Sequence, residues 1–367
     1  MSQRASPRQG PLVGLKGVLL GGIGPAPYAA MLMADLGADI TRVERPGPVA
    51  EAANPLHPKV DLFARGQAVI RADLATECGR TQVWGLLEEA DFLLEGFRPG
   101  VLERMGFVPE RCHQRNPGLV IVRITGWGQQ GPLAKAPGHD INYLALAGAL
   151  SLMPKRAGSE GRAIPLNLIA DFAGGGLWAC FGLLSAIHER SRSGRGQVVD
   201  AAMVDGVMSL MGMAYALRGS GGLAARPAES LLDGGAHFYD TYPCADGQEV
   251  AVGAVEPQFY ADLCRLCGLE EPEPGMRFEA GRWSGLKERL ATKLSTRERD
   301  EWCAGNDAQA ACVTPVLALE EAMRHPHHLA RNGFMQGESM TVPAPGPRFS
   351  RTPAGLPVGY EFLGDHQ

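Results

Sequence analysis

A histidine and an aspartate lie in two turn-like segments, and an apolar run follows each of them. His139 belongs to the segment Gly-His-Asp-Ile-Asn-Tyr at 138–143, and Asp171 belongs to the segment 167–176. A reaction that removes a proton from one face of a carbon atom and returns it on the other face needs two such proton carriers. The pair therefore suggests acid–base chemistry at a carbon atom.

Each of these residues also has a purely structural interpretation. A histidine after a glycine, such as His139, is often a surface residue or a helix cap. Asp140 and Asp171 stand where an N-cap is expected before predicted helices. However, three glycines follow Asp171, and they would let a ligand approach closely while helix N–H groups stabilise negative charge. Glu256, which ends a predicted strand, is expected from its local sequence to be an ordinary exposed glutamate.

A β-α-β unit opens the chain. We expect a strand at 16–20, a helix at 28–36 and a strand at 39–44, which together favour a parallel sheet. The glycine-rich turn between the first strand and the helix does not fit the dinucleotide fingerprint. Pro25 and Pro27 replace positions whose N–H groups would hold a pyrophosphate, so NAD binding is disfavoured.

The rest of the chain predicts a second, smaller domain after a Gly-, Ala- and Pro-rich linker at 218–229. A glycine-rich loop at 125–132 follows a strand, where open α/β sheets bind ligands. The further predicted elements are strands at 91–95, 118–125 and 197–201, helices at 84–90, 141–152, 172–190 and 203–217, a hairpin of 238–244 with 248–255, and helices at 258–267, 283–293 and 296–303. The predicted class is α/β, with a Rossmann-like large domain, a parallel sheet and a smaller α+β domain.

Composition excludes several classes of protein. The 367 residues carry a net charge of −5, which argues against nucleic acid as a partner. We find no apolar run of the roughly 18 residues that a membrane span needs, and no apolar signal core in residues 1–10, so we expect a cytoplasmic protein.

The cysteines and histidines do not predict a metal site. The eight cysteines are expected to be free thiols, and Cys264 and Cys267 are expected to pack on a helix rather than bind metal. The cluster His325, His327 and His328 is expected to lie at a helix end. Three arginines, Arg45, Arg98 and Arg104, flank predicted strand ends and together could bind a polyphosphate.

Several long motifs resemble the α-methylacyl-CoA racemases, which belong to the family III CoA-transferase superfamily (CaiB/BaiF type). The resemblance covers nearly the whole chain, from about residue 11 to about residue 364, and the motifs occur in the family order. They are 138–143, 167–176, 194–201, 232–236 and 252–260.

The resemblance implies inversion of the α-carbon of a 2-methylacyl-CoA thioester through an enolate. It assigns His139 as the base on one face and Asp171 as the base on the other, and it assigns Glu256 to hold the histidine by a hydrogen bond. An apolar site would raise the pKa of Asp171 enough for it to be protonated during part of the cycle. We expect helix N–H groups near Asp171 to hold the enolate oxygen.

The resemblance also places the CoA moiety, which is part of the substrate, so no separate cofactor is expected. Arg45, Arg98 and Arg104 match positions near the CoA phosphates, and Ala72, Asp73 and Leu74 match the segment beside the adenine. Gly138, Asp140 and Tyr143 are also assigned to CoA binding. The chain departs from the family where the usual basic run reads Gln67-Ala68-Val69 and where Ala75 replaces a basic residue, so weaker phosphate binding is expected.

The family fold implies an interlocked homodimer. Residues 11–220 would form the large CoA-binding domain, 221–330 the small domain, and 331–367 a C-terminal return to the large domain. The active site would lie between the large domain of one chain and the small domain of the other. Glu256 would then come from the second chain, and a monomer would be inactive.

Two alternatives remain open. In a CoA-transferase of the same superfamily, Asp171 would be the nucleophile that forms an acyl anhydride and then an aspartyl-CoA thioester. A non-catalytic acyl-CoA-binding protein is the other. The presence of both His139 and Glu256 favours the racemase. The acyl chain cannot be predicted, although Met208, Met211 and Met213 would suit either an apolar surface or, more simply, the core.

Overall fold

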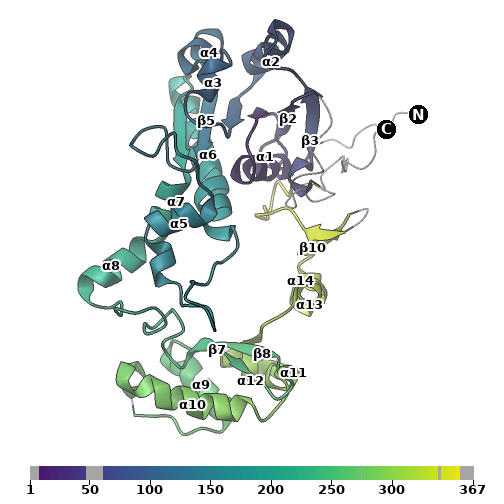
Figure 1. Ribbon diagram of the computed structural model, residues 1–367. Coiled ribbons are helices and arrows are strands. Elements are labelled where there is room, and N and C mark those ends of the chain that lie inside the picture. Colours follow the sequence, from purple (N-terminus) through teal and green to yellow (C-terminus); the bar gives the residue numbers. More distant parts are fainter. Residues whose placement is uncertain (1–7, 47–60, 274, 338–339, 356–367) are drawn as a thin grey trace. The chain divides into compact units, whose positions relative to one another are not determined.

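The computed structural model describes residues 8–46, 61–273, 275–337 and 340–355. The chain divides into two compact units (Figure 1). The large unit comprises Met1–Ala147, Pro165–Leu210 and Asn332–Gln367, and the small unit comprises Gly148–Ile164 and Met211–Arg331.

Six parallel strands form the sheet of the large unit, in the order β3-β2-β1-β4-β5-β6. They are β1 (Lys16–Leu20), β2 (Asp39–Glu44), β3 (Gln67–Arg71), β4 (Phe92–Glu95), β5 (Val120–Thr125) and β6 (Val198–Ala202). The order reverses between β1 and β4, and such sheets bind ligands outside the carboxyl ends of the strands at this point. The predicted α/β class with a parallel sheet is confirmed, but β3 was not predicted.

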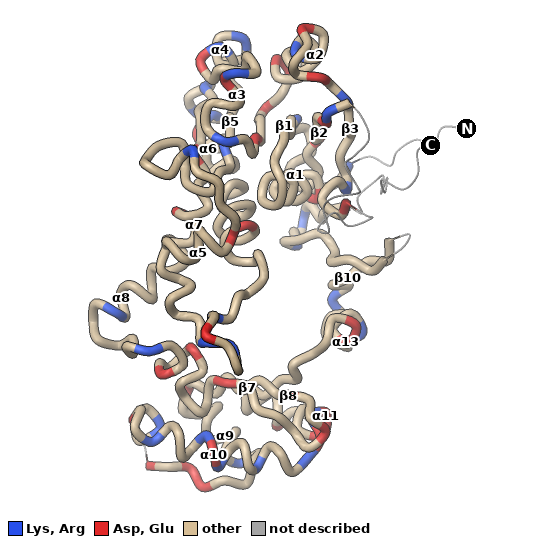
Figure 2. Tube along the Cα trace, viewed as in Figure 1, with Lys and Arg blue, Asp and Glu red and all other residues tan. Residues whose placement is uncertain are grey.

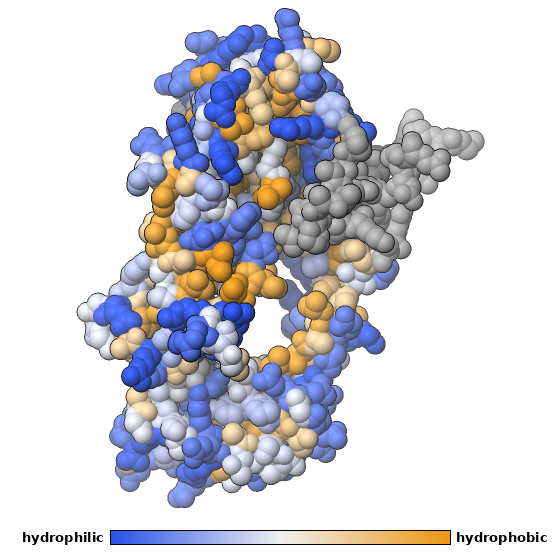
Figure 3. All heavy atoms as spheres, viewed as in Figure 1, coloured by the Kyte–Doolittle hydropathy of each residue, from blue (hydrophilic) through white to orange (hydrophobic). Residues whose placement is uncertain are grey.

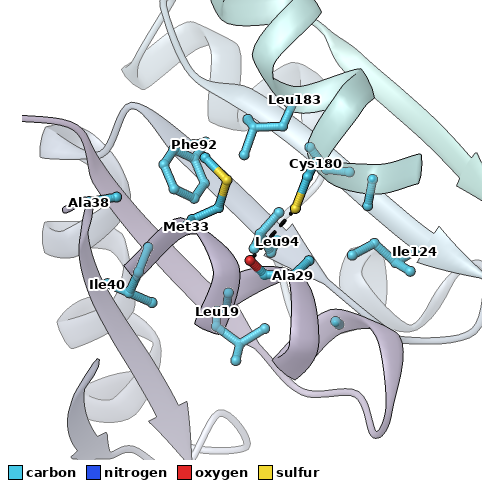
Figure 4. Close-up of a cluster of buried hydrophobic side chains, with 14 of the residues drawn as sticks. Leu19, Ala29, Met33, Ala38, Ile40, Phe92, Leu94, Ile124, Cys180 and Leu183 are labelled. Atoms are coloured by element: carbon cyan, nitrogen blue, oxygen red, sulfur yellow. Dashed lines mark hydrogen bonds between the residues drawn. The ribbon is translucent and has the colours of Figure 1, made fainter. Parts of the chain in front are cut away.

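Helices cover both faces of this sheet, because successive side chains of each strand point to opposite faces. Leu19 of β1 packs in a core cluster with α1 and α6, whereas its neighbours Val18 and Leu20 pack in a second cluster with α2, α3 and α4. Figure 4 shows the first cluster, in which the Cys180 thiol points to the carbonyl oxygen of Ala29. The helices are η1 (Leu62–Ala64), α1 (Pro25–Asp35), α2 (Glu77–Glu89), α3 (Val101–Arg104), α4 (Pro109–Arg115), α5 (Asp140–Leu146), the π-helix η3 (Leu168–Leu177), α6 (Trp178–Ser193) and α7 (Met203–Leu210).

The π-helix η3 corrects a predicted boundary. A helix was expected to begin at residue 172 with Asp171 as its N-cap, but the helix begins at Leu168 and Asp171 lies within it. Glycines 174–176 do not interrupt the helix, because they are buried where it packs against α1 and α7. The local sequence could not predict this packing.

We expected no apolar run long enough to span a membrane, but η3 and α6 join into one helix, Leu168–Ser193, that has this length. By length and composition alone it could cross a membrane, with a mean hydropathy of 1.5. However, Ala179 and Leu183 of this helix are buried in the core of the large unit, below α1 and the sheet. In its most apolar 18-residue window, 39% of the residues are buried.

The small unit has an antiparallel sheet in the order β7-β8-β9 beside several helices. The predicted hairpin is confirmed as β7 and β8, and its core surrounds the buried rings of Phe238 and Trp302. The elements are β7 (Tyr239–Pro243), β8 (Glu249–Gly253), β9 (Val313–Pro315), η2 (Ala149–Leu152), α8 (Gly212–Ser220), α9 (Pro257–Cys267), η4 (Met276–Phe278), η5 (Ala280–Arg282), α10 (Trp283–Leu294), α11 (Arg299–Trp302), α12 (Gly305–Ala310), α13 (Leu319–Arg324) and α14 (Pro326–Ala330).

The last described segment belongs to the large unit. Strands β10 (Phe334–Gln336) and β11 (Thr341–Pro343) pair antiparallel. The guanidinium of Arg65 donates a hydrogen bond to the carbonyl oxygen of Pro343 over 2.9 Å. The same guanidinium forms a buried ion pair with Asp35 at the end of α1. Arg65 therefore links the end of α1 to β11 in the C-terminal segment.

Candidate active site

The carboxyl group of Asp171 lies against the turn that follows β1. A Cβ atom added to Gly24 in this turn would lie 3.3 Å from Oδ2 of Asp171. The side-chain amide of Asn167 donates a hydrogen bond to the same oxygen over 3.1 Å. Gly24 directly precedes α1, so Asp171 lies at the carboxyl edge of the sheet, beside the point where the strand order reverses.

The surroundings of Asp171 favour its protonated form. Burial raises the pKa of Asp171, and the negative charge of Asp140 raises it further. The hydrogen bond from Asn167 and the charge of His139 act in the opposite direction, but the net shift is upward. A raised pKa increases the fraction of carboxyl groups that carry a proton at a given pH.

His139 is the N-cap residue of α5, and it is exposed. Its backbone N–H donates a hydrogen bond to Oδ1 of Asn142 over 3.0 Å. Asp140 was expected to cap this helix, and that expectation was wrong because Asp140 is already the first helical residue. The imidazole therefore leaves the chain at the start of α5, close enough to Asp171 for its charge to affect the carboxyl pKa.

Asp140 connects the two helices instead of capping one. Its side chain is buried, and its Oδ2 accepts hydrogen bonds from the backbone N–H groups of Ala170 (2.8 Å) and Asp171 (2.9 Å). These are two of the helix N–H groups that were expected to hold an enolate oxygen. They are engaged by a carboxylate, so that oxygen needs another donor.

The ring of Tyr143 packs on two glycines beside the same site. A Cβ at Gly126 would lie 2.2 Å from this ring, and one at Gly138 would lie 2.8 Å from it, so both positions require glycine. Trp127 meets the ring edge-on at a centroid distance of 4.7 Å. Burial raises the pKa of Tyr143 to about 12, with a further contribution from Asp171, so the hydroxyl keeps its proton.

The arginines and the adenine segment assigned to CoA follow the carboxyl ends of three strands of the parallel sheet, β2, β3 and β4. Arg45 follows β2, residues 72–74 follow β3, and Arg98 and Arg104 follow β4. The three arginines and Asp73 are exposed, whereas Ala72 is buried. In a parallel sheet these ends share one edge, which is also the edge that holds Asp171.

A buried charge network holds the segment that carries Arg98 and Arg104. Arg123 of β5 donates hydrogen bonds to Glu95 at the end of β4 and to Glu103 of α3, each over 2.7 Å. Burial raises the pKa of Glu95 despite this arginine. In Figure 2 blue and red segments lie together on α3 and α4, because each helix carries both arginine and glutamate residues.

Glu256 belongs to the small unit, where it is the exposed N-cap residue of α9. Its pairing with His139 stays a prediction. Within the described parts of the chain, no group of three or more His, Cys, Asp or Glu side chains could hold a metal ion.

Sequence reasoning missed two features of this site. Asn167 precedes Asp171 by four residues, a spacing that brings side chains together on a helix, but the helix was expected to begin later. The expected core role of the methionines was also wrong in part. The single predicted helix over 203–217 breaks at Met211 into α7 and α8, and Met208 and Met213 are exposed.

Comparisons with known proteins show the family of the chain. The family model for CoA-transferase family III matches residues 12–366. The chain is 42% identical to the α-methylacyl-CoA racemase of Mus musculus over 94% of this chain and 87% of that protein, and 39% identical to the α-methylacyl-CoA racemase of Homo sapiens over 97% and 91%. A crystal structure of a CaiB/BaiF family protein from Brucella suis aligns with a TM-score of 0.79 at 26% identity, covering 96% of each chain.

Proposed function

Because the chain belongs to CoA-transferase family III, we propose that it is an α-methylacyl-CoA racemase, which inverts the α-carbon of 2-methylacyl-CoA thioesters. The observation that supports the proposal is the hydrogen bond from the backbone N–H of Asp171 to Asp140, the residue after His139, which brings the two chain segments together at the carboxyl edge of the sheet. The identity to two racemases over nearly the whole chain supports the same function.

The chemistry needs one proton shared between the two groups. The thioester acidifies the α-carbon, and neutral His139 takes the α-proton from one face with its own lone pair. The electron pair of the broken C–H bond forms a carbon–carbon double bond, and the carbonyl π pair moves onto the oxygen to give the enolate. Protonated Asp171 then returns a proton to the opposite face of the same carbon, and the thioester re-forms. The reverse direction exchanges the roles. The upward pKa shift of Asp171 increases the fraction of carboxyl groups that carry this proton.

The same edge of the sheet would bind the CoA moiety of the substrate. Arg45, Arg98 and Arg104 would neutralise the CoA phosphates, residues 72–74 would line the adenine, and no separate cofactor is required. The segment 67–69, where the resemblance implies a basic run, reads Gln-Ala-Val and forms the first part of β3 (Gln67–Arg71), which carries a cation only at its last residue, Arg71. We expect weaker phosphate binding as a result.

An exposed apolar surface would receive the acyl chain. Leu166 and Leu168, which flank Asn167, are 73% and 53% exposed, and Ile141 lies two residues after His139 and is also exposed. Orange atoms gather beside α5 in Figure 3. Apolar side chains that are exposed next to both proton carriers suit a branched acyl group better than a polar acid.

We also propose that the enzyme is a homodimer in which Glu256 of one chain reaches His139 of the other. A stripe of exposed apolar side chains at helical spacing supports this assembly. It consists of Leu177, Phe181 and Leu184, of which Phe181 is 63% exposed. Such a stripe on a core helix is typical of a surface that a partner covers.

The test is incubation of the purified enzyme with one epimer of a 2-methylacyl-CoA in deuterated water. We expect deuterium at the α-carbon together with approach to an equal mixture of epimers. The variants His139→Ala and Asp171→Asn should each lower the rate by a factor of about 1,000 or more, because each removes an acid–base group. His327→Ala, which removes an exposed histidine of α14, is the matched control and should keep the full rate.

The same experiment separates the two alternatives. A CoA-transferase would move CoA to an added free acid without isotope uptake, would lose activity in Asp171→Asn, and would retain it in His139→Ala. A binding protein would bind the thioester in calorimetry and would show neither reaction.

A further inference from the structure

The carboxylate of Asp140 joins two chain segments that are separated by 30 residues of sequence. It begins α5, directly after His139, and it accepts the backbone N–H groups of Ala170 and Asp171 with the single oxygen Oδ2. These N–H groups belong to the first turn of η3, where no intrahelical acceptor precedes them. One side chain thus links the helix that starts beside His139 with the helix that holds Asp171.

The second oxygen of Asp140 points to an electrostatic role. Oδ1 is buried and has no hydrogen-bond partner among the described residues. The residue as a whole is 5% exposed. A buried oxygen without a partner is costly, and such groups are retained mostly where they serve a function.

We propose that Asp140 is a positioning residue, whose carboxylate clamps the start of η3 to the start of α5 and so holds the carboxyl group of Asp171 and the imidazole of His139 at a fixed separation across the α-carbon. This inference rests on the proposed racemase function. It goes beyond the role in CoA binding that the family resemblance suggested for Asp140, because Oδ2 of Asp140 accepts two backbone N–H groups of η3.

The same carboxylate sets the charge around Asp171. The groups that act on the Asp171 carboxyl are Asp140, His139 and the amide of Asn167, and Gly24 packs against it without a charge. Tyr143 lies nearby and stays neutral, with Arg98 in its surroundings. Of these groups, Asp140 supplies the negative charge, so it favours a proton on Asp171.

Two substitutions separate the clamp from the charge. In Asp140→Asn the side-chain oxygen can still accept both N–H groups, but the charge is lost. We expect kcat within about threefold of the parent value at its optimum, and an acid limb of the kcat/KM profile that moves to lower pH. In Asp140→Ala both N–H groups lose their acceptor, and we expect kcat to fall on the order of tenfold or more with KM for the thioester nearly unchanged.

The matched control is Asp246, which also accepts backbone N–H groups from two segments, those of Gln248 and Arg299. Asp246→Asn and Asp246→Ala should leave both the pH profile and kcat unchanged. If Asp140→Ala keeps the parent kcat, or if its loss lies entirely in KM, Asp140 is not a positioning residue. If the acid limb of the kcat/KM profile of Asp140→Asn lies at the same pH as in the parent, the proposed electrostatic effect of Asp140 on Asp171 is wrong.

A readout without turnover keeps the test separate from the proposed function. Carbon-13 NMR of the aspartate carboxyl groups, with Asp171 assigned through Asp171→Asn, reports its titration directly. We expect the Asp171 titration to move to lower pH in Asp140→Asn. If the parent protein shows no isotope exchange, the racemase proposal fails, whereas the NMR titration still supports or overturns the link between Asp140 and Asp171.

Discussion

At the scale of single residues, the carboxyl group of Asp171 has surroundings that favour proton transfer at the expense of stability. Burial and the charge of Asp140 raise its pKa, and only Asn167 and His139 oppose them. A raised carboxyl pKa means that the ionised form, relative to the protonated form, is less stable in the folded protein than in the unfolded chain. Proteins commonly accept such a cost where a group must exchange protons.

This cost gives a pH dependence of stability with a defined sign. The pKa of Asp171 in the folded protein lies above its value in the unfolded chain. Its contribution to the free energy of unfolding is therefore fully present below the unfolded pKa and is lost as the pH rises through the folded pKa. We expect Asp171→Asn, which is neutral at every pH, to have a larger free energy of unfolding than the parent at pH 7. The advantage should disappear below about pH 4, where the carboxyl is protonated in both states. Urea unfolding at pH 7 and below pH 4 measures this difference in the free energy of unfolding between the variant and the parent. An equal difference at both pH values would contradict the prediction.

At the scale of elements, the position of Asp171 depends on how closely η3 approaches α7. Backbone meets backbone there without an intervening side chain, because a Cβ at Gly206 would lie 2.0 Å from the carbonyl oxygen of Gly174. The buried glycines of η3 similarly meet Pro25 and Tyr28 of α1. The helix that carries the carboxyl group is therefore held by glycine contacts on two sides.

Gly206→Ala tests this contact. The added methyl group must push α7 away from η3, and we expect a loss of about 1–3 kcal/mol in the free energy of unfolding, together with a lower kcat. Gly85→Ala in α2 is the matched control, since no atom lies within 4 Å of its added Cβ. It should stabilise the protein by about 0.5–1 kcal/mol with unchanged kcat. Equal effects of the two substitutions would show that the close approach is unimportant.

At the scale of the whole molecule, the proposed homodimer would bring residues of two chains to one active site. The exposed stripe of Leu177, Phe181 and Leu184 lies on the helix that continues directly from η3. If a partner chain covers this stripe, the assembly also supports the helix that carries Asp171. Activity and association should then be lost together.

Phe181→Asp tests this coupling. A carboxylate in the centre of an apolar interface should weaken the dimer by a factor of about 100 or more, in line with the loss of a central aromatic contact. Sedimentation velocity at micromolar concentration should show a monomer, and racemisation should fall in proportion to the remaining dimer. Leu319→Asp, which alters an exposed leucine of α13, is the control and should change neither. A fully active monomeric variant would contradict the proposed sharing of Glu256.

Much of the fold could be predicted because local patterns reflect local structure. The strands around Leu19 and Leu93 are short apolar runs between turn residues, and the hairpin of the small unit has a turn with Gly247 at its tip. The edge strand β3 escaped prediction because half-exposed strands lack such a run: Gln67 and Arg71 end it, and its alternation is weak. Edge strands are recognised by the neighbour they pair with, here β2.

The amino-acid sequence by itself determined the α/β class, the parallel sheet, and a histidine and an aspartate as the residues able to carry protons. Only the tertiary structure decided that Asp171 lies inside a π-helix against Gly24 and that Asp140 binds the backbone of that helix rather than capping its own. The physical reason is that hydrogen bonds and glycine contacts between segments 30 or more residues apart leave no periodic signal in the chain. They arise only when packing brings those segments together.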